Sequence, residues 1–157
     1  MKRKYVLGMS TLLLSGAVLA QADRSELPQP STDFIDQHFS SEKIAEIDVD
    51  DSWYNRSDSE TYEVEFESGI ELDFNKKGEI TEIETEDRAG IPLSVFPEAV
   101  RTSLEREHPD ADVVAWEKEK NGHEIELRDG SELWFDNNGN MKKDKKRMKK
   151  EDHKDNH

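Results

Sequence analysis

Thr61-Tyr-Glu-Val-Glu-Phe-Glu-Ser-Gly-Ile-Glu-Leu-Asp-Phe-Asn-Lys-Lys-Gly78 is a run in which apolar and acidic residues alternate. It returns 61 positions later as Gly122-His-Glu-Ile-Glu-Leu-Arg-Asp-Gly-Ser-Glu-Leu-Trp-Phe-Asp-Asn-Asn-Gly139. Apolar residues and glycines occupy matching places in the two copies: Val64/Ile125, Phe66/Leu127, Leu72/Leu133, Phe74/Phe135, Gly69/Gly130 and Gly78/Gly139. Such self-similarity at a fixed spacing predicts two tandem repeats, at about residues 27–84 and 91–141.

The alternation predicts half-buried antiparallel strands, with apolar side chains on one face and acidic side chains on the other. Strands are expected at 43–49, 61–67, 70–75, 79–84, 112–119, 123–128 and 131–136, with a short one near Asn140. A proline-bounded helical segment precedes each set, at 27–39 and 96–108, and Thr32-Asp33 is the expected N-cap of the first. The predicted fold is α+β, with each repeat a helix packed on a three- to four-stranded antiparallel sheet.

The turns at Gly69 and Gly130 set the register of the two hairpins. A two-residue loop would place apolar Phe66 opposite Glu71, which contradicts the alternation. A three-residue loop, made of a type I turn and a left-handed glycine, restores it. The expected cross-strand pairs are then Val64–Leu72, Glu65–Glu71, Glu63–Asp73, Ile125–Leu133, Glu126–Glu132 and Glu124–Trp134.

This order of elements resembles the PepSY-like, β-lactamase-inhibitor-protein-like family. The resemblance rests on the hairpin runs 62–74 and 122–130, on a Leu-Pro…Phe type of helical segment before each set of strands, and on closing turns similar to Phe-Asp-x-x-Gly. Those turns are Phe74-Asn-Lys-Lys-Gly78 and Phe135-Asp-Asn-Asn-Gly139. The resemblance covers about residues 27–141. It implies helix-on-sheet modules in periplasmic or secreted bacterial proteins that bind or inhibit and do not catalyse.

Residues 1–22 have the pattern of a cleaved signal peptide. Lys2-Arg3-Lys4 precedes an apolar run at 5–19, and the small residues up to Ala22 fit a signal peptidase site. The chain has no cysteine, which excludes a lipid-anchoring cysteine, a disulfide framework and a thiolate metal site. We therefore expect a periplasmic or secreted bacterial protein with no membrane insertion after cleavage, a domain at 23–141 and a basic disordered tail at 142–157.

The charge of the chain limits its partners. The sequence carries 37 Asp and Glu against 22 Lys and Arg, for a net charge of −15, and the basic residues gather after Met141. An acidic body repels nucleic acid and anionic lipid, so the expected partners are cations, basic proteins or uncharged surfaces.

One interpretation is that the protein binds another protein or a peptide through aromatic side chains. Trp53 and Tyr54 belong to an extra segment at 50–60 that the second repeat lacks, and loops often carry function. Trp134 is expected on the outward face of the sheet, where its counterpart is Asp73, and aromatic anchors dominate interfaces. The alternative for each aromatic residue is packing against its own chain.

A second interpretation is that the acidic face binds a cation such as Ca²⁺. Like charges directly opposite each other destabilise a sheet, so a counterion is favoured there. The candidate residues are Glu63, Glu65, Glu71 and Asp73. A plain solvated face is the alternative, since salt screens exposed charges.

No pattern of catalytic residues stands out. The sequence has no Gly-x-Ser-x-Gly, phosphate loop or zinc signature. Asp136-Asn-Asn-Gly-Asn140 begins like a calcium loop, but Met141 and Arg147 stand where that loop needs Gly and Glu, so a turn is expected. We expect a non-enzymatic protein with no catalytic residue, no dedicated metal site and no cofactor.

Overall fold

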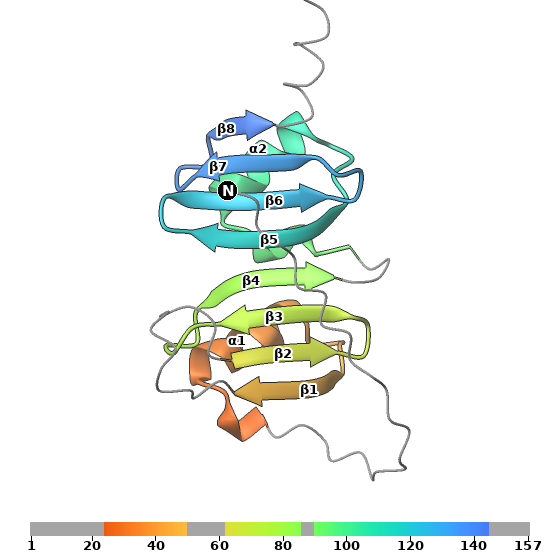
Figure 1. The fold of residues 1–157 in the computed structure, drawn as a ribbon, viewed down its shortest axis with the longest axis vertical. Helices are drawn as coiled ribbons and strands as arrows, with labels where there is room; N and C mark the ends of the chain where they lie inside the picture. The colour runs from red at the N-terminus through yellow and green to blue at the C-terminus, as the bar shows by residue number, and fades with distance from the viewer. Residues whose placement is uncertain (1–23, 50–61, 86–89, 145–157) are drawn as a thin grey trace, which may run out of the picture.

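The computed structural model describes residues 24–49, 62–85 and 90–144. These residues form one eight-stranded antiparallel sheet in which each strand pairs with the next along the chain (Figure 1). Two short 3₁₀ helices and two α-helices precede the strands. The elements are η1 Arg24–Glu26, α1 Gln29–His38, β1 Ile44–Val49, β2 Tyr62–Phe66, β3 Ile70–Phe74, β4 Ile80–Thr85, η2 Leu93–Val95, α2 Glu98–Glu107, β5 Val113–Glu119, β6 Gly122–Leu127, β7 Glu132–Asp136 and β8 Met141–Asp144.

The predicted α+β class is confirmed, with both helices and the antiparallel strands in place. The chain passes twice through the order 3₁₀ helix, α-helix and four strands. The two sets of strands join into one sheet because β4 pairs with β5 through Glu82–Glu117, Ile83–Trp116 and Glu84–Ala115.

The first helix lies within the predicted segment 27–39, but its predicted N-cap at Thr32-Asp33 is wrong. Pro28 occupies the N-cap position of α1 and Pro30 lies in its first turn, so Thr32 and Asp33 lie inside the helix. Proline suits the first turn, since its missing N–H has no intrahelical partner there and its φ is already helical. The η1 and η2 segments were not predicted, because three residues are too few to show a periodicity.

Both hairpins have the register that the three-residue turn predicts. Val64 pairs with Leu72 and Ile125 with Leu133. Gly69 and Gly130 have φ values of 80° and 77°, a region that residues with a Cβ seldom adopt. Each glycine N–H donates to the last residue of the preceding strand, at 2.9 Å for Gly69 to the Phe66 carbonyl.

The core lies between one face of the sheet and the two helices, which lie behind the strands in Figure 1. On the α1 side, Phe39 stacks on Phe66 with ring centroids 5.4 Å apart. On the α2 side, Phe96 meets Trp116 edge to face at 5.9 Å. Both helices therefore cover the same face, and the acidic residues of the strands point to the other.

The last strand extends past the predicted end of the domain. β8 runs Met141–Asp144 and pairs with β7, so three residues assigned to the tail, 142–144, belong to the sheet. The segment with Trp53 and Tyr54 lies outside the described residues, as do residues 1–23, where a signal peptide is predicted, and the chain after 144. Within the described ranges, no helix is long and apolar enough to cross a membrane.

Candidate functional site

Two rows of acidic residues cross the face of the sheet opposite the helices, which we call the outward face. Each row joins residues that lie directly opposite one another on successive strands, and the buried row from Val64 to Leu133 runs between them on the inward face. Row 1 consists of Asp48, Glu63, Asp73, Glu82, Glu117 and Glu124, and ends at Trp134 on β7. Row 2 consists of Glu46, Glu65, Glu71, Glu84, Ala115, Glu126 and Glu132.

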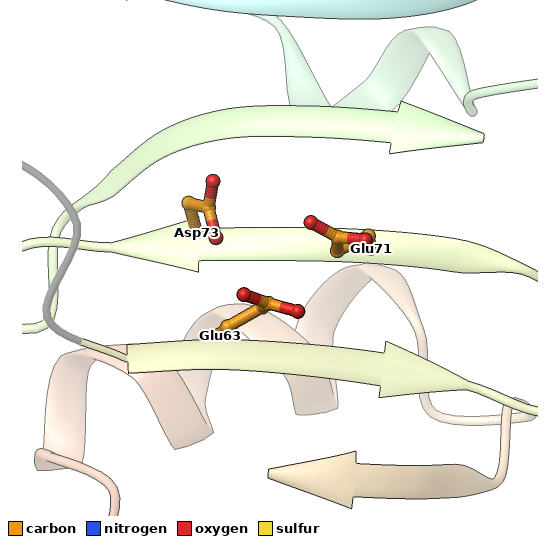
Figure 2. A group of neighbouring side chains, drawn as sticks. All are labelled: Glu63, Glu71 and Asp73. Atoms are coloured by element: carbon orange, nitrogen blue, oxygen red, sulfur yellow. The ribbon is translucent and has the colours of Figure 1, made fainter. Parts of the chain in front are cut away.

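Three members of the rows bring their carboxylates together. Glu63 projects from β2, and Glu71 and Asp73 project from β3, on the side of the sheet away from α1 (Figure 2). One carboxylate oxygen from each lies within 4.8 Å of the others. Glu63 is exposed, whereas Glu71 and Asp73 are half-buried. We call these residues the carboxylate trio.

The trio contains three of the four cation-binding candidates taken from the sequence. Glu63 and Asp73 lie opposite each other, as do Glu65 and Glu71. Glu65 is in row 2 and exposed, and it is not part of the group whose oxygens meet within 4.8 Å. Hairpin register therefore identified the acidic pairs but not which oxygens come together, since that depends on side-chain conformation.

Glu82 is a site residue that the sequence did not single out. It lies between Asp73 on β3 and Glu117 on β5. Burial, and after it the nearby carboxylates of Glu84, Glu117 and Asp73, together raise the pKa of Glu82 to about 8. A carboxylic acid in such surroundings keeps its proton near neutral pH, because the neutral form avoids both desolvation and repulsion.

Trp134 is placed as the register predicts. It lies on the outward face of β7, opposite Glu124 of β6 and at the register position of Lys143 of β8. Trp134 is half-buried. Trp53 and Tyr54, the other two aromatic candidates, lie outside the described residues.

In the turn after β7, the carboxylate of Asp136 accepts hydrogen bonds from the turn itself. Asp136 Oδ1 accepts from the backbone N–H groups of Asn138 and Asn140, each at 2.9 Å. The amide of Asn140, these backbone N–H groups and Lys142 hold the pKa of Asp136 far below its usual range. The expected turn is confirmed, with the carboxylate serving the backbone.

One buried polar pair lies on the inward face. Trp116 Nε1 donates to Nδ1 of His123 at 3.3 Å, and the two rings stack with centroids 5.8 Å apart. His123 is only 5% exposed. Burial lowers the pKa of His123, and the charge of Lys118 lowers it further, so the ring is held neutral as an acceptor.

The chain is similar to a set of bacterial proteins. The model of the family described as "Putative beta-lactamase-inhibitor-like, PepSY-like" matches residues 60–143. A "putative calcium-regulated periplasmic protein" of Bacteroides thetaiotaomicron is 30% identical with a TM-score of 0.67, covering 78% of this chain and 92% of that one. A "putative periplasmic protein" of the DUF2874 family from Bacteroides vulgatus is 30% identical with a TM-score of 0.66 and the same coverage.

Another "putative periplasmic protein" of Bacteroides vulgatus is 31% identical with a TM-score of 0.66, covering 78% of this chain and 94% of that one. The search of curated proteins gave no match.

Proposed function

This chain belongs to the PepSY-like, β-lactamase-inhibitor-like family, and we propose that it is a non-catalytic periplasmic binding protein whose acidic outward face takes a divalent cation, Ca²⁺ above all. The observation that carries the proposal is the carboxylate trio of Glu63, Glu71 and Asp73, whose oxygens lie within 4.8 Å of one another. Glu63 is exposed, so a cation can reach the trio from solvent.

The spacing of the trio suits one calcium ion. Calcium binds six to eight oxygens at about 2.4 Å, so two ligands on opposite sides of one ion are about 4.8 Å apart. Water molecules complete the coordination on the exposed side. A site of this kind, built on flat strands and not in a closed loop, fits the weak affinity of extracellular calcium modules, with a Kd of about 0.1–1 mM.

The rows around the trio favour a cation over an empty face. Glu65 on β2 and Glu84 on β4 both lie directly opposite Glu71. Opposed like charges destabilise a sheet by a few tenths of a kcal/mol per pair, roughly. A bound cation removes this repulsion for several pairs at once, so binding and folding stability rise together.

The relatives support the same choice of ion and compartment. A protein of Bacteroides thetaiotaomicron, 30% identical over most of both chains, is described as calcium-regulated and periplasmic. We extend that property to this chain because its own strands carry the acidic rows. The basic n-region and apolar run of residues 1–22 support export by a cleaved signal peptide, which N-terminal sequencing of the mature protein tests.

Thermal unfolding with and without calcium tests the proposal. At a Kd of 1 mM, 10 mM CaCl₂ stabilises the folded state by about 1.4 kcal/mol, which raises Tm by about 5 °C over NaCl of equal ionic strength. Replacing Glu63→Gln and Asp73→Asn together should abolish the calcium shift. Replacing Glu126→Gln and Glu132→Gln removes the same charge at the other end of the sheet and should leave it. An equal loss in both variants would mean that calcium acts by general screening.

A second candidate function is the binding of a protein or peptide, and Trp134 favours it. Its ring is half-buried and outward, with Glu124 and Glu132 beside it. An aromatic side chain with carboxylates beside it fits a partner with basic side chains. Aromatic residues supply much of the binding energy of an interface, and complementary charges steer the two proteins together. Trp53 and Tyr54 remain candidates for the same contact on sequence grounds.

We also propose that the two halves are copies of one module. The order of elements is the same in both. The hairpin registers and the positive φ angles of Gly69, Gly78, Gly130 and Gly139 support the proposal, because they recur at equivalent places.

A further inference from the structure

A strongly basic segment follows the last strand of the sheet. Lys145, Lys146, Arg147, Lys149 and Lys150 supply five basic residues in six positions, which we call the basic segment, residues 145–150. It lies outside the residues that the structure describes, and it is attached to the end of β8 at Asp144. The body to which it is attached is acidic, since the whole chain carries a net charge of −15.

The point of attachment lies at the end of both acidic rows. β8 ends at Asp144, which pairs with Leu133 of β7. Leu133 stands between Glu132, the last residue of row 2, and Trp134, the last residue of row 1. The chain therefore leaves the sheet at its β8 edge, next to the strand on which both acidic rows end.

The basic segment is long enough to cross half of the sheet. Six extended residues span about 20 Å. Neighbouring strands lie about 4.8 Å apart, so β4 is about 19 Å from β8. The segment can thus reach every strand from β7 to β4, whose outward carboxylates belong to Glu132, Glu126, Glu124, Glu117, Glu84 and Glu82.

We propose that the basic segment docks on the outward face of β4–β7 of its own chain, with its cationic side chains on Glu117, Glu124 and Glu126 and one of them over the ring of Trp134. Lysine and arginine bind the face of an indole as well as carboxylates. Each exposed ion pair is weak and sensitive to salt. The tether supplies a local concentration in the millimolar range, so several weak pairs suffice to populate the docked state.

The inference goes beyond calcium binding, which we place on β2 and β3. It assigns the other half of the outward face to a peptide that the chain itself carries. A protein partner that uses Trp134 would then compete with the basic segment.

Carbodiimide cross-linking of the dilute full chain tests the inference, with the joined residues mapped by mass spectrometry. At about 20 mM NaCl, cross-links should join Lys145–Lys150 to Glu117, Glu124, Glu126 or Glu132 within one chain, and at about 500 mM NaCl they should fall at least fivefold. Cross-links to Glu98 and Glu105 on α2 at equal frequency would overturn the docking on the outward face. Cross-links between two chains would overturn its intramolecular form.

NMR of the full chain tests the same docking without a cross-linking reaction. Replacing the five basic residues by Gln in the full chain should shift the backbone amide resonances of β5–β7 in low salt. Lys76, Lys77 and Lys120 are exposed in turns. Replacing these three residues by Gln should leave the β5–β7 amide resonances unchanged. Unchanged β5–β7 resonances in the variant of the basic segment would overturn the inference. The calcium shift in Tm reports on the carboxylate trio separately, so the proposed function can stand or fall without this one.

Discussion

Glu82 on β4 lies directly opposite Glu117 on β5, in the pairing that joins the first four strands to the last four. Three residue pairs make this junction, and the outward side chains beside it are acidic or, at Ala115, small. Buried Ile83 and Trp116 hold the junction together from the inward face. Apolar burial on the inward face thus stabilises the centre of the sheet, and repulsion between carboxylates on the outward face destabilises it.

Replacing Glu82→Gln should stabilise the protein at high pH. The folded state raises the pKa of Glu82 from 4.5 to about 8, so its stabilising contribution is complete below pH 4.5 and is lost as pH rises toward 8. The free energy of unfolding of the variant should be about 1–2 kcal/mol higher than that of the wild type at pH 8. At pH 5 the two should differ little. Urea unfolding at the two pH values measures the difference. Glu105→Gln, on the exposed surface of α2, is the control, and an equal gain at both pH values would contradict the prediction.

His123 should make the protein sensitive to acid. Its pKa in the folded state is lowered from 6.5 by burial, so the stability that depends on its neutral form is present above pH 6.5 and is lost as pH falls below that value. The ring titration followed by NMR should have a midpoint below 6.5, and Lys118→Gln should move it upward. The unfolding free energy of His123→Gln should depend less on pH between 6.5 and 5. A midpoint at or above 6.5 would rule this out.

Gly139→Ala should be more destabilising than Gly130→Ala. Both glycines have a left-handed φ, of 75° and 77°. A Cβ at Gly139 would clash with the backbone carbonyl of Ala99 in α2, whereas a Cβ at Gly130 would meet nothing within 4 Å. Backbone strain alone costs about 1 kcal/mol, and the clash adds about 1–3 kcal/mol. Denaturant unfolding of the two variants measures the difference, and equal losses would show that the turn can move away from the helix.

Trp134→Ala should weaken capture of a protein partner and leave the fold intact. The side chain lies on the outward face and not in the core, so the loss of stability should be about 1 kcal/mol or less. An aromatic hot spot contributes about 2 kcal/mol or more, so capture at moderate salt should drop at least tenfold. Trp134→Phe keeps an aromatic ring and should retain part of the binding. Undiminished capture by the alanine variant would remove Trp134 from the contact.

The hairpins could be predicted because the length of the turn determines every cross-strand pair in them. Once the turn at Gly69 has three residues, the pleat dictates that Glu63 lies opposite Asp73 and Val64 opposite Leu72. The same logic places Trp134 on the outward face. Local sequence was sufficient here, because each pair is separated by only a few residues.

The rest depended on contacts between distant segments or on weak local patterns. The Glu82–Glu117 pairing joins strands on opposite sides of α2, and no alternation shows which strands will become neighbours. The length of β8 was missed because Met141-Lys-Lys-Asp144 is nearly all polar and its place depends on pairing with β7. The meeting of the three carboxylates of the trio depends on side-chain conformation, which a sequence pattern does not contain.

The uncovered face also governs how copies of this protein behave toward one another. A sheet with helices on one side only offers its other side for stacking, the arrangement that β-sandwiches and fibrils use. Here two such faces would bring rows of carboxylates together across about 10 Å, and their mutual repulsion opposes the approach. The acidic rows therefore oppose the face-to-face stacking of two copies of this sheet.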